Sequence, residues 1–160
     1  MNVDNHDVFF MKEALRQSQR AFDADEVPVG AVIVFEKKVI AKAHNQIELL
    51  KDPTAHAEMI AITQATNYLG VKWLQECTLY VTIEPCSMCA GALVLARLGR
   101  LCFGADEPKT GACGSVLNIV NHKQLNHRVD VTRGVLSQEC SSLLSDFFRK
   151  KRTVKAKGLN

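Results

Sequence analysis

Strand-like and helix-like segments alternate along this chain, and their order restricts the fold more than any other feature of the sequence. Short apolar runs rich in β-branched residues predict strands, and apolar residues three or four apart predict helices. The expected helices are 6–24, 54–68, 84–98 and a last one that begins at Ser137, and the expected strands are 29–35, 39–44, 77–82, 100–104 and 129–135. The polar stretch 45–53 is expected to be a loop. Strands joined through helices need crossovers that place helices on both faces of one sheet, so we predict an α/β fold.

The size and composition fit a single folded domain. The chain has 160 residues, of which 47% are hydrophobic and 23% charged, so it can bury a core without covalent cross-links. We expect one domain over 1–152 and a short basic tail over 153–160. No apolar run approaches the ~20 residues of a membrane-spanning helix, and the first residues do not resemble a secretory signal. Six cysteines without a disulfide-like pattern favour a reducing, cytoplasmic compartment, and we expect no membrane partner.

Positive charge is concentrated near the C-terminus. Residues 149–157 hold six of the 20 Lys and Arg residues and no acidic residue. The other 14 basic residues stand against 17 acidic ones, so the rest of the chain has a formal charge of −3. Such a segment either contacts nucleic-acid phosphates or is a solvated helix end whose charges suit the helix dipole. The adjacent Phe147 and Phe148 either both close the core or offer one ring to an unpaired base.

Two short motifs carry the residues that point to chemistry. His56 and Glu58 lie where one helix is expected to begin, with Thr54 as its N-cap, and Cys86 and Cys89 open the next helix. Two thiolates and one imidazole form a ligand set that suits Zn²⁺, and the dipoles at two helix N-termini favour the thiolate form. Because three protein ligands leave a fourth position open, we predict one catalytic Zn²⁺ per chain.

Glu58 is expected to handle protons and not to bind the metal. Residues two apart do not share a helix face, so His56 and Glu58 reach one site only if it lies off the helix end. A carboxylate there can take the proton of a water whose pKa the metal lowers, and pass it on. Two simpler interpretations fit less well: the Cys86–Cys89 pair lacks the flanking residues of a redox pair, and no second cysteine pair completes a structural zinc site.

The joint pattern His-x-Glu and Pro-Cys-x-x-Cys is the known signature of the zinc nucleobase deaminases. Other segments extend the likeness beyond this signature. They are Asn45 with 52–58, then 78–82, 84–92, 109–112, 126–128 and 144–149. Through them the chain resembles the bacterial tRNA-specific adenosine deaminases, of the zinc-dependent cytidine/deoxycytidylate deaminase superfamily, over roughly residues 8–152.

This resemblance implies a three-layer α/β/α, cytidine-deaminase-like fold with a central five-stranded mixed sheet, and a homodimer. It implies hydrolytic conversion of adenosine to inosine at the wobble position of a tRNA anticodon, with the anticodon stem-loop as partner. The site residues it implies are His56, Cys86 and Cys89 for zinc, Glu58 for proton transfer, and Asn45, Val29, Gly30, Ala31, Ala57 and Pro85 for the substrate pocket. The residues it implies for RNA contact are Lys109, Phe148, Arg149, Lys150 and Arg152.

Two other functions stay open on the sequence alone. A free-base or nucleoside deaminase acting on guanine or cytosine would share the zinc signature, but its substrate has no RNA backbone for the basic segment to hold. A non-catalytic, zinc-stabilised RNA-binding protein would have no use for a proton-transferring Glu58.

Overall fold

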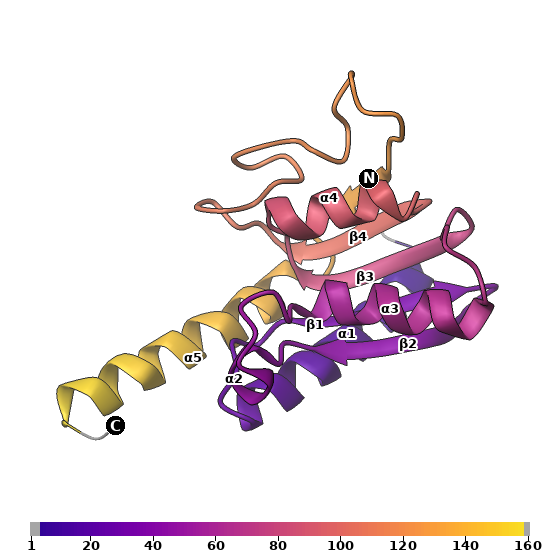
Figure 1. The fold of residues 1–160 in the computed structure, drawn as a ribbon. Helices are drawn as coiled ribbons and strands as arrows, with labels where there is room; N and C mark the ends of the chain where they lie inside the picture. Colours follow the sequence, from indigo (N-terminus) through magenta and orange to yellow (C-terminus); the bar gives the residue numbers. More distant parts are fainter. Residues whose placement is uncertain (1–3, 159–160) are drawn as a thin grey trace.

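The computed structural model describes residues 4–158, in which helices cover both faces of one five-stranded sheet (Figure 1). The helices are α1 (Asn5–Asp23), α2 (Ile47–Leu50), α3 (Ala57–Leu69), α4 (Ser87–Leu95) and α5 (Ser137–Ala156). The strands are β1 (Gly30–Phe35), β2 (Lys38–His44), β3 (Cys77–Ile83), β4 (Arg100–Ala105) and β5 (Asp130–Arg133). None of the described helices is both long and apolar enough to cross a bilayer.

The sheet has the order β2-β1-β3-β4-β5 and contains both strand directions. β1 pairs antiparallel with β2 and β3, whereas β3 with β4 and β4 with β5 are parallel. Antiparallel neighbours need only a tight turn, as between β1 and β2, but parallel neighbours need a crossover, which α4 supplies between β3 and β4. The predicted three-layer α/β/α fold with a five-stranded mixed sheet is confirmed.

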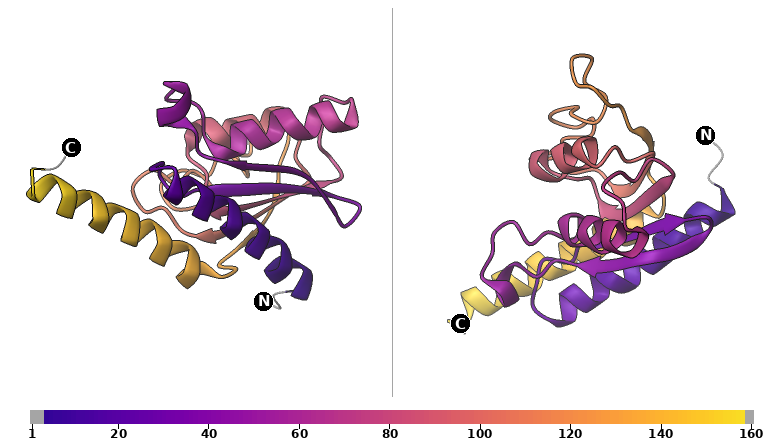
Figure 2. Two further views of the ribbon diagram at one scale, coloured as in Figure 1. Left: turned by 90° about the horizontal axis from the view of Figure 1, so that it is seen from below. Right: turned by 45° about the vertical axis from the view of Figure 1, so that its right-hand side comes forward.

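Alternate residues of the central strands contribute to two separate cores. On β3, Leu79 and Val81 pack with Leu93 of α4 and the buried alanines of α3, whereas Tyr80 packs with Met11 of α1. This division follows from the pleat, because successive strand side chains point to opposite faces. α1 and α5 therefore cover one face of the sheet, and α3 and α4 cover the other (Figure 2).

The close approach of α1 to the sheet depends on Gly30 and on a partly buried ion pair. A Cβ atom at Gly30 would collide with the backbone of α1, so only glycine fits there. At the other end of α1, Asp7 accepts hydrogen bonds from Arg100 at 2.8 and 2.7 Å and from the Tyr80 hydroxyl at 2.8 Å. The hydrogen bonds from Arg100 are the main reason why the pKa of Asp7 is lowered. These contacts join α1 to β3 and β4.

Both α3 and α4 begin later than the sequence pattern predicts. The prediction that Thr54 caps α3 is wrong, because its N–H and its hydroxyl both donate to Asp52 Oδ1, at 2.8 and 2.7 Å, in a turn before the helix. The N-cap position of α3 is His56. The helix α4 begins after Cys86, and it is followed at Arg97 by a φ of 51°, so it is shorter than expected.

The stretch 45–53, which was predicted to be a loop, contains the short helix α2. The buried carboxylate of Glu26 accepts the N–H groups of Glu48 at 2.8 Å and Leu49 at 2.9 Å. These are N–H groups that a helix cannot pair internally at its own N-terminus. The partner lies 22 residues earlier in the chain, so local sequence gives no sign of it.

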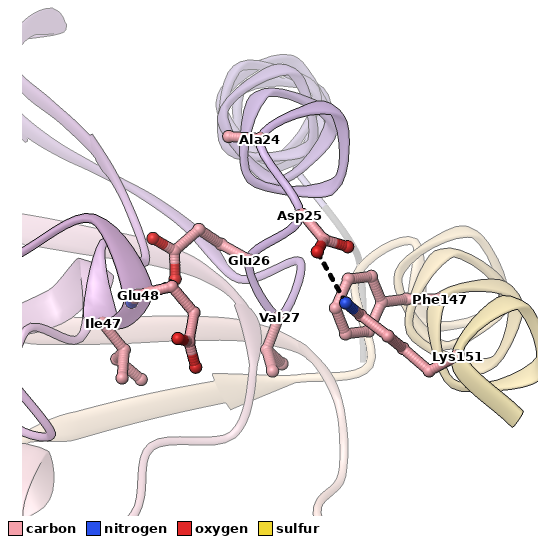
Figure 3. Close-up of a pocket in the computed structure, with 8 residues that line it drawn as sticks. All are labelled: Ala24, Asp25, Glu26, Val27, Ile47, Glu48, Phe147 and Lys151. Atoms are coloured by element: carbon pink, nitrogen blue, oxygen red, sulfur yellow. Dashed lines mark hydrogen bonds and ion pairs between the residues drawn. The ribbon is translucent and has the colours of Figure 1, made fainter. Parts of the chain in front are cut away.

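The last helix continues to Ala156, and the expected boundary after residue 152 therefore lies inside α5. Its C-terminal half projects beyond the sheet (Figure 1). Where α5 passes the end of α1, Lys151 Nζ lies 2.6 Å from Asp25 Oδ2, at a cavity of about 470 Å³ that α2 also lines (Figure 3). The acidic residues at this cavity, Asp25 and the α2-capping Glu26, already have partners in Lys151 and the N-terminus of α2.

Candidate active site

The three expected metal ligands come together at the N-termini of α3 and α4. His56 and Cys86 are the N-cap residues of these helices, with extended backbone conformations (ψ of 149° and 177°), and Cys89 lies within the first turn of α4. Because His56 precedes the helix and has an extended backbone, helical geometry does not set the direction of its side chain. The predicted convergence of His56 and Glu58 at a site off the helix end is therefore the arrangement that this backbone produces.

The spacing of the ligand atoms matches a tetrahedral zinc site. His56 Nδ1 lies 3.6 Å from Cys86 Sγ and 3.5 Å from Cys89 Sγ. With Zn–S and Zn–N bonds of about 2.3 and 2.05 Å and tetrahedral angles, the two ligand atoms would be about 3.6 Å apart. Hydrogen bonds from Cys89 and then His56 lower the pKa of Cys86, which favours the thiolate form that binds metals, whereas the contact with Cys86 raises the pKa of Cys89. The cluster can hold a metal ion through Nδ1 and two sulfurs.

Glu58 is buried beside this cluster but does not belong to it. Its side chain is only 3% exposed, and Oε1 has no hydrogen-bond partner among the described residues. Burial raises the pKa of this carboxyl group. A buried polar atom without a hydrogen-bond partner lowers the stability of the fold. Glu58 nevertheless occupies this position, in the wall of a cavity that His56 and Cys86 also line. Glu58 is therefore placed to exchange a proton with whatever occupies that cavity.

Asn45 is fixed at the same cavity from the end of β2. Its Oδ1 accepts the N–H of Ala57 at 2.8 Å, and its own N–H donates to the carbonyl of Val29 at 3.1 Å. The first bond orients the side-chain amide, so that Nδ2 is the group without a protein partner within residues 4–158. Asn45 thus caps α3 with one end and offers a donor with the other.

The cavity beside the cluster has a volume of about 210 Å³. Its lining comes from one end of the sheet, from the starts of α3 and α4, from the loop after β4 and from α5. The residues are Val27, Val29, Asn45, Ile47, His56, Glu58, Ile83, Glu84, Cys86, Glu107, Thr110, Leu144 and Phe148. Among the pocket residues implied by the resemblance, Gly30, Ala31, Ala57 and Pro85 are absent from this lining. Gly30 and Ala31 face the two packed cores instead.

The pair Phe147 and Phe148 is divided between core and site. Phe147 is 4% exposed and packs edge-on against Phe22 of α1, whereas Phe148 is 42% exposed and lines the cavity. Adjacent helical residues point about 100° apart, so only one ring can face the core. The sequence alone pointed to neither Leu144 nor the loop residues Glu107 and Thr110 as part of this wall.

The residues expected to contact RNA lie on two surfaces near the cavity. Lys109 is exposed in the loop after β4, next to the lining residue Thr110. Arg149, Lys150 and Arg152 are exposed on α5. Of these, Arg149 pairs with Asp146 at 2.8 Å, and Lys150 lies over the ring of Phe22. Arg152 has no ion-pair partner in the described part of the chain.

Comparison with known sequences places the chain in a family. A family model for MafB19-like deaminases matches residues 4–152. The chain is 54% identical over 144 residues to a tRNA-specific adenosine deaminase of Aquifex aeolicus (strain VF5), covering 90% of this chain and 95% of the relative. It is 46% identical over 149 residues to a tRNA-specific adenosine deaminase of Bacillus subtilis (strain 168), covering 93% and 92%.

Comparison with solved structures agrees with this placement. A structure from a study of A-to-I editing by tRNA:A34 deaminases at the wobble position of transfer RNA superposes with a TM-score of 0.82 and 41% identity, over 84% of this chain and 98% of the other. A guanine deaminase from Nitrosomonas europaea, at 24% identity and a TM-score of 0.73 over 86% and 81% of the two chains, shows a shared fold alone. The resemblance seen in the motifs is confirmed: this chain belongs to the tRNA-specific adenosine deaminases.

Proposed function

We propose that this chain converts adenosine to inosine at the wobble position of a tRNA anticodon by hydrolytic deamination. The observation that carries the proposal is the buried Glu58, whose Oε1 lacks a protein partner beside a His-Cys-Cys cluster in a base-sized cavity. The relatives named above as tRNA-specific adenosine deaminases align over nine tenths of the chain, which supports tRNA as the substrate.

His56, Cys86 and Cys89 would hold one Zn²⁺ per chain, consistent with their ligand-atom spacing. Zinc in such a site supplies a water of lowered pKa for attack on an electrophilic carbon. Glu58 takes a proton from the attacking water and delivers it to N1 of adenine. It then takes the remaining proton from the new C6 hydroxyl and transfers it to the 6-amino group, so that the C6–N bond breaks, the C6=O bond forms and ammonia leaves.

The remaining cavity residues hold a single extruded base. A base in a helix is inaccessible, so the substrate is a loop nucleotide that can leave its stack. Asn45 Nδ2 donates to the nucleoside, and Val29 contacts it through an apolar surface. Phe148 offers a partly exposed ring for stacking, and the basic face of α5 with Lys109 meets the RNA backbone.

We further propose that the protein is a cytoplasmic homodimer. Leu95 at the end of α4 is 80% exposed, although the neighbouring Leu93 and Val94 are buried in the core. A second copy seated there would cover it. Sedimentation at micromolar concentration should therefore find a dimer, and a Leu95→Asp variant should shift it towards monomer. A wild-type protein that sediments only as monomer would exclude this assembly.

The catalytic proposal is tested with the full chain on four substrates: an anticodon stem-loop with adenosine at the wobble position, free adenosine, cytidine and guanine. Inosine and ammonia should form from the stem-loop. The Glu58→Gln variant should keep its zinc and lose about 10²–10⁴-fold in kcat, as expected for an acid–base group. Glu76→Gln, at the exposed distant end of β3, is the matched control. Normal turnover by zinc-replete Glu58→Gln, or ammonia from free guanine alone, would refute the proposal.

A further inference from the structure

Glu84 stands out as a buried charge at the active-site end of β3. Its side chain is fully buried, and it follows the last residue of the strand. Its two oxygens accept hydrogen bonds from four donors: Oε1 from the N–H of Glu107 at 3.1 Å and from the hydroxyl of Ser115, and Oε2 from the N–H groups of Cys113 at 3.0 Å and Ser115 at 3.1 Å. All four donors belong to the loop that joins β4 to β5.

Further contacts join Glu84 and Pro85 to the end of β4, to this β4–β5 loop (residues 106–129) and to β5. The backbone of Glu84 donates to Ala105 at 2.9 Å, and Ala112 donates to the carbonyl of Pro85 at 2.9 Å. A Cβ atom at Gly111 would come within 2.5 Å of the Glu84 carboxyl group, so glycine is needed for the loop to approach this closely. Arg133, whose guanidinium lies 3.9 Å from Glu84 Oε1, adds a positive charge to the same cluster.

The loop held in this way forms one wall of the nucleoside cavity. Glu107 and Thr110 line the cavity, and the exposed Lys109 lies between them in the sequence. The metal-ligand cluster and Glu58 are positioned by α3 and α4, whose buried residues share one core with Ala112, Cys113 and Val120 of the loop. Within the described residues, however, the hydrogen bonds to the Glu84 carboxylate come from the loop and from neither helix.

We propose that Glu84 is a positioning residue that sets the substrate affinity of this site by anchoring the β4–β5 loop. Its role rests on the proposed function, because the loop encloses the nucleoside cavity. Glu84 itself lines the cavity, but its buried carboxylate accepts all four of its hydrogen bonds from the loop, so we assign its effect to the placement of Glu107, Lys109 and Thr110. Through these hydrogen bonds the β4–β5 loop keeps one conformation and forms a wall of a cavity for a single nucleotide.

The test compares Glu84→Gln with Ser115→Ala and with Glu76→Gln as the control. Glutamine keeps the size of the side chain but replaces one accepting oxygen by an amide group that cannot accept. In Glu84→Gln the KM for the anticodon stem-loop should rise about 10-fold, equivalent to about 1.4 kcal/mol, with a smaller fall in kcat. Ser115→Ala removes the hydroxyl that donates to Glu84, from a residue that does not line the cavity, and should raise KM by a smaller factor. Amide exchange at Cys113 and Ser115 should be faster in Glu84→Gln.

An unchanged KM in folded, zinc-replete Glu84→Gln, with only a lower melting temperature, would overturn the proposal and leave Glu84 a purely structural residue. An unchanged KM in Ser115→Ala together with a raised one in Glu84→Gln would also overturn it, because it would indicate direct substrate contact. Where Glu84→Gln fails to fold, Ser115→Ala decides alone. A wild-type protein inactive on the stem-loop defeats the proposed function, and amide exchange then still tests the anchoring of the loop.

Discussion

Removing two charges from the exposed face of α5 tests how this protein holds RNA. Three neighbouring charges are already engaged within the protein: Arg149 with Asp146, Lys151 with Asp25, and Lys150 over an aromatic ring. Arg152 and Lys155 have no such partners within residues 4–158. Because they are three residues apart on one helix, they share a face and can meet one RNA backbone together.

The double variant Arg152→Gln/Lys155→Gln should flatten the salt dependence of tRNA binding by a definite amount. Each phosphate contact contributes about 0.7 to the log–log slope for single-stranded nucleic acid and about 0.9 for a duplex. Two contacts therefore account for a slope change of about 1.4 to 1.8. Between about 50 and 200 mM salt, the wild-type affinity should then fall about 7- to 12-fold more than that of the variant.

The assay is equilibrium binding of the anticodon stem-loop over a series of salt concentrations, with zinc content measured in parallel. The control is Lys37→Gln/Lys38→Gln, which removes two exposed charges at the hairpin turn, at the end of the sheet away from the cavity. It should lower affinity little and leave the slope nearly unchanged. An α5 variant whose slope equals that of the wild type would show that the RNA backbone lies on another surface.

Two other perturbations test the metal cluster and the packing of α1. Cys86→Ala should lose most of its zinc in metal analysis of the purified protein, because one of only three ligands is removed; full occupancy would refute the ligand assignment. Asp7→Asn should lower the free energy of unfolding in urea by about 2–3 kcal/mol, less than the about 3–5 kcal/mol of a fully buried pair because the Arg100 side chain is 28% exposed. Since the pKa of Asp7 is lowered in the folded state, its contribution is complete above the ordinary pKa of about 3.9, and the difference between the two proteins should shrink as the pH falls below that value. A difference that persists unchanged at lower pH would refute the charge-based explanation.

The layered fold could be predicted from the sequence because its signals are local. The strand positions follow from apolar runs such as 29–35, and helix α1 follows from the spacing of its apolar residues. The element boundaries were less accurate wherever a distant partner decides them. The helix α2 depends on the carboxylate of Glu26, 22 residues earlier, whereas the later start of α3 has a local cause, the turn that Asp52 makes with Thr54.

By itself, the sequence determined which residues can make a metal cluster, since the residue types and their spacing at two helix starts are local properties that tertiary packing does not change. Only the tertiary structure decided the walls of the cavity. In the folded chain Phe148 lines the site while Phe147 is buried, and Gly30 packs against α1. The β4–β5 loop is hydrogen-bonded to Glu84. Each of these depends on segments that are far apart in the chain, and the free energy of such contacts comes from burial and hydrogen bonding that form only when the sheet has assembled.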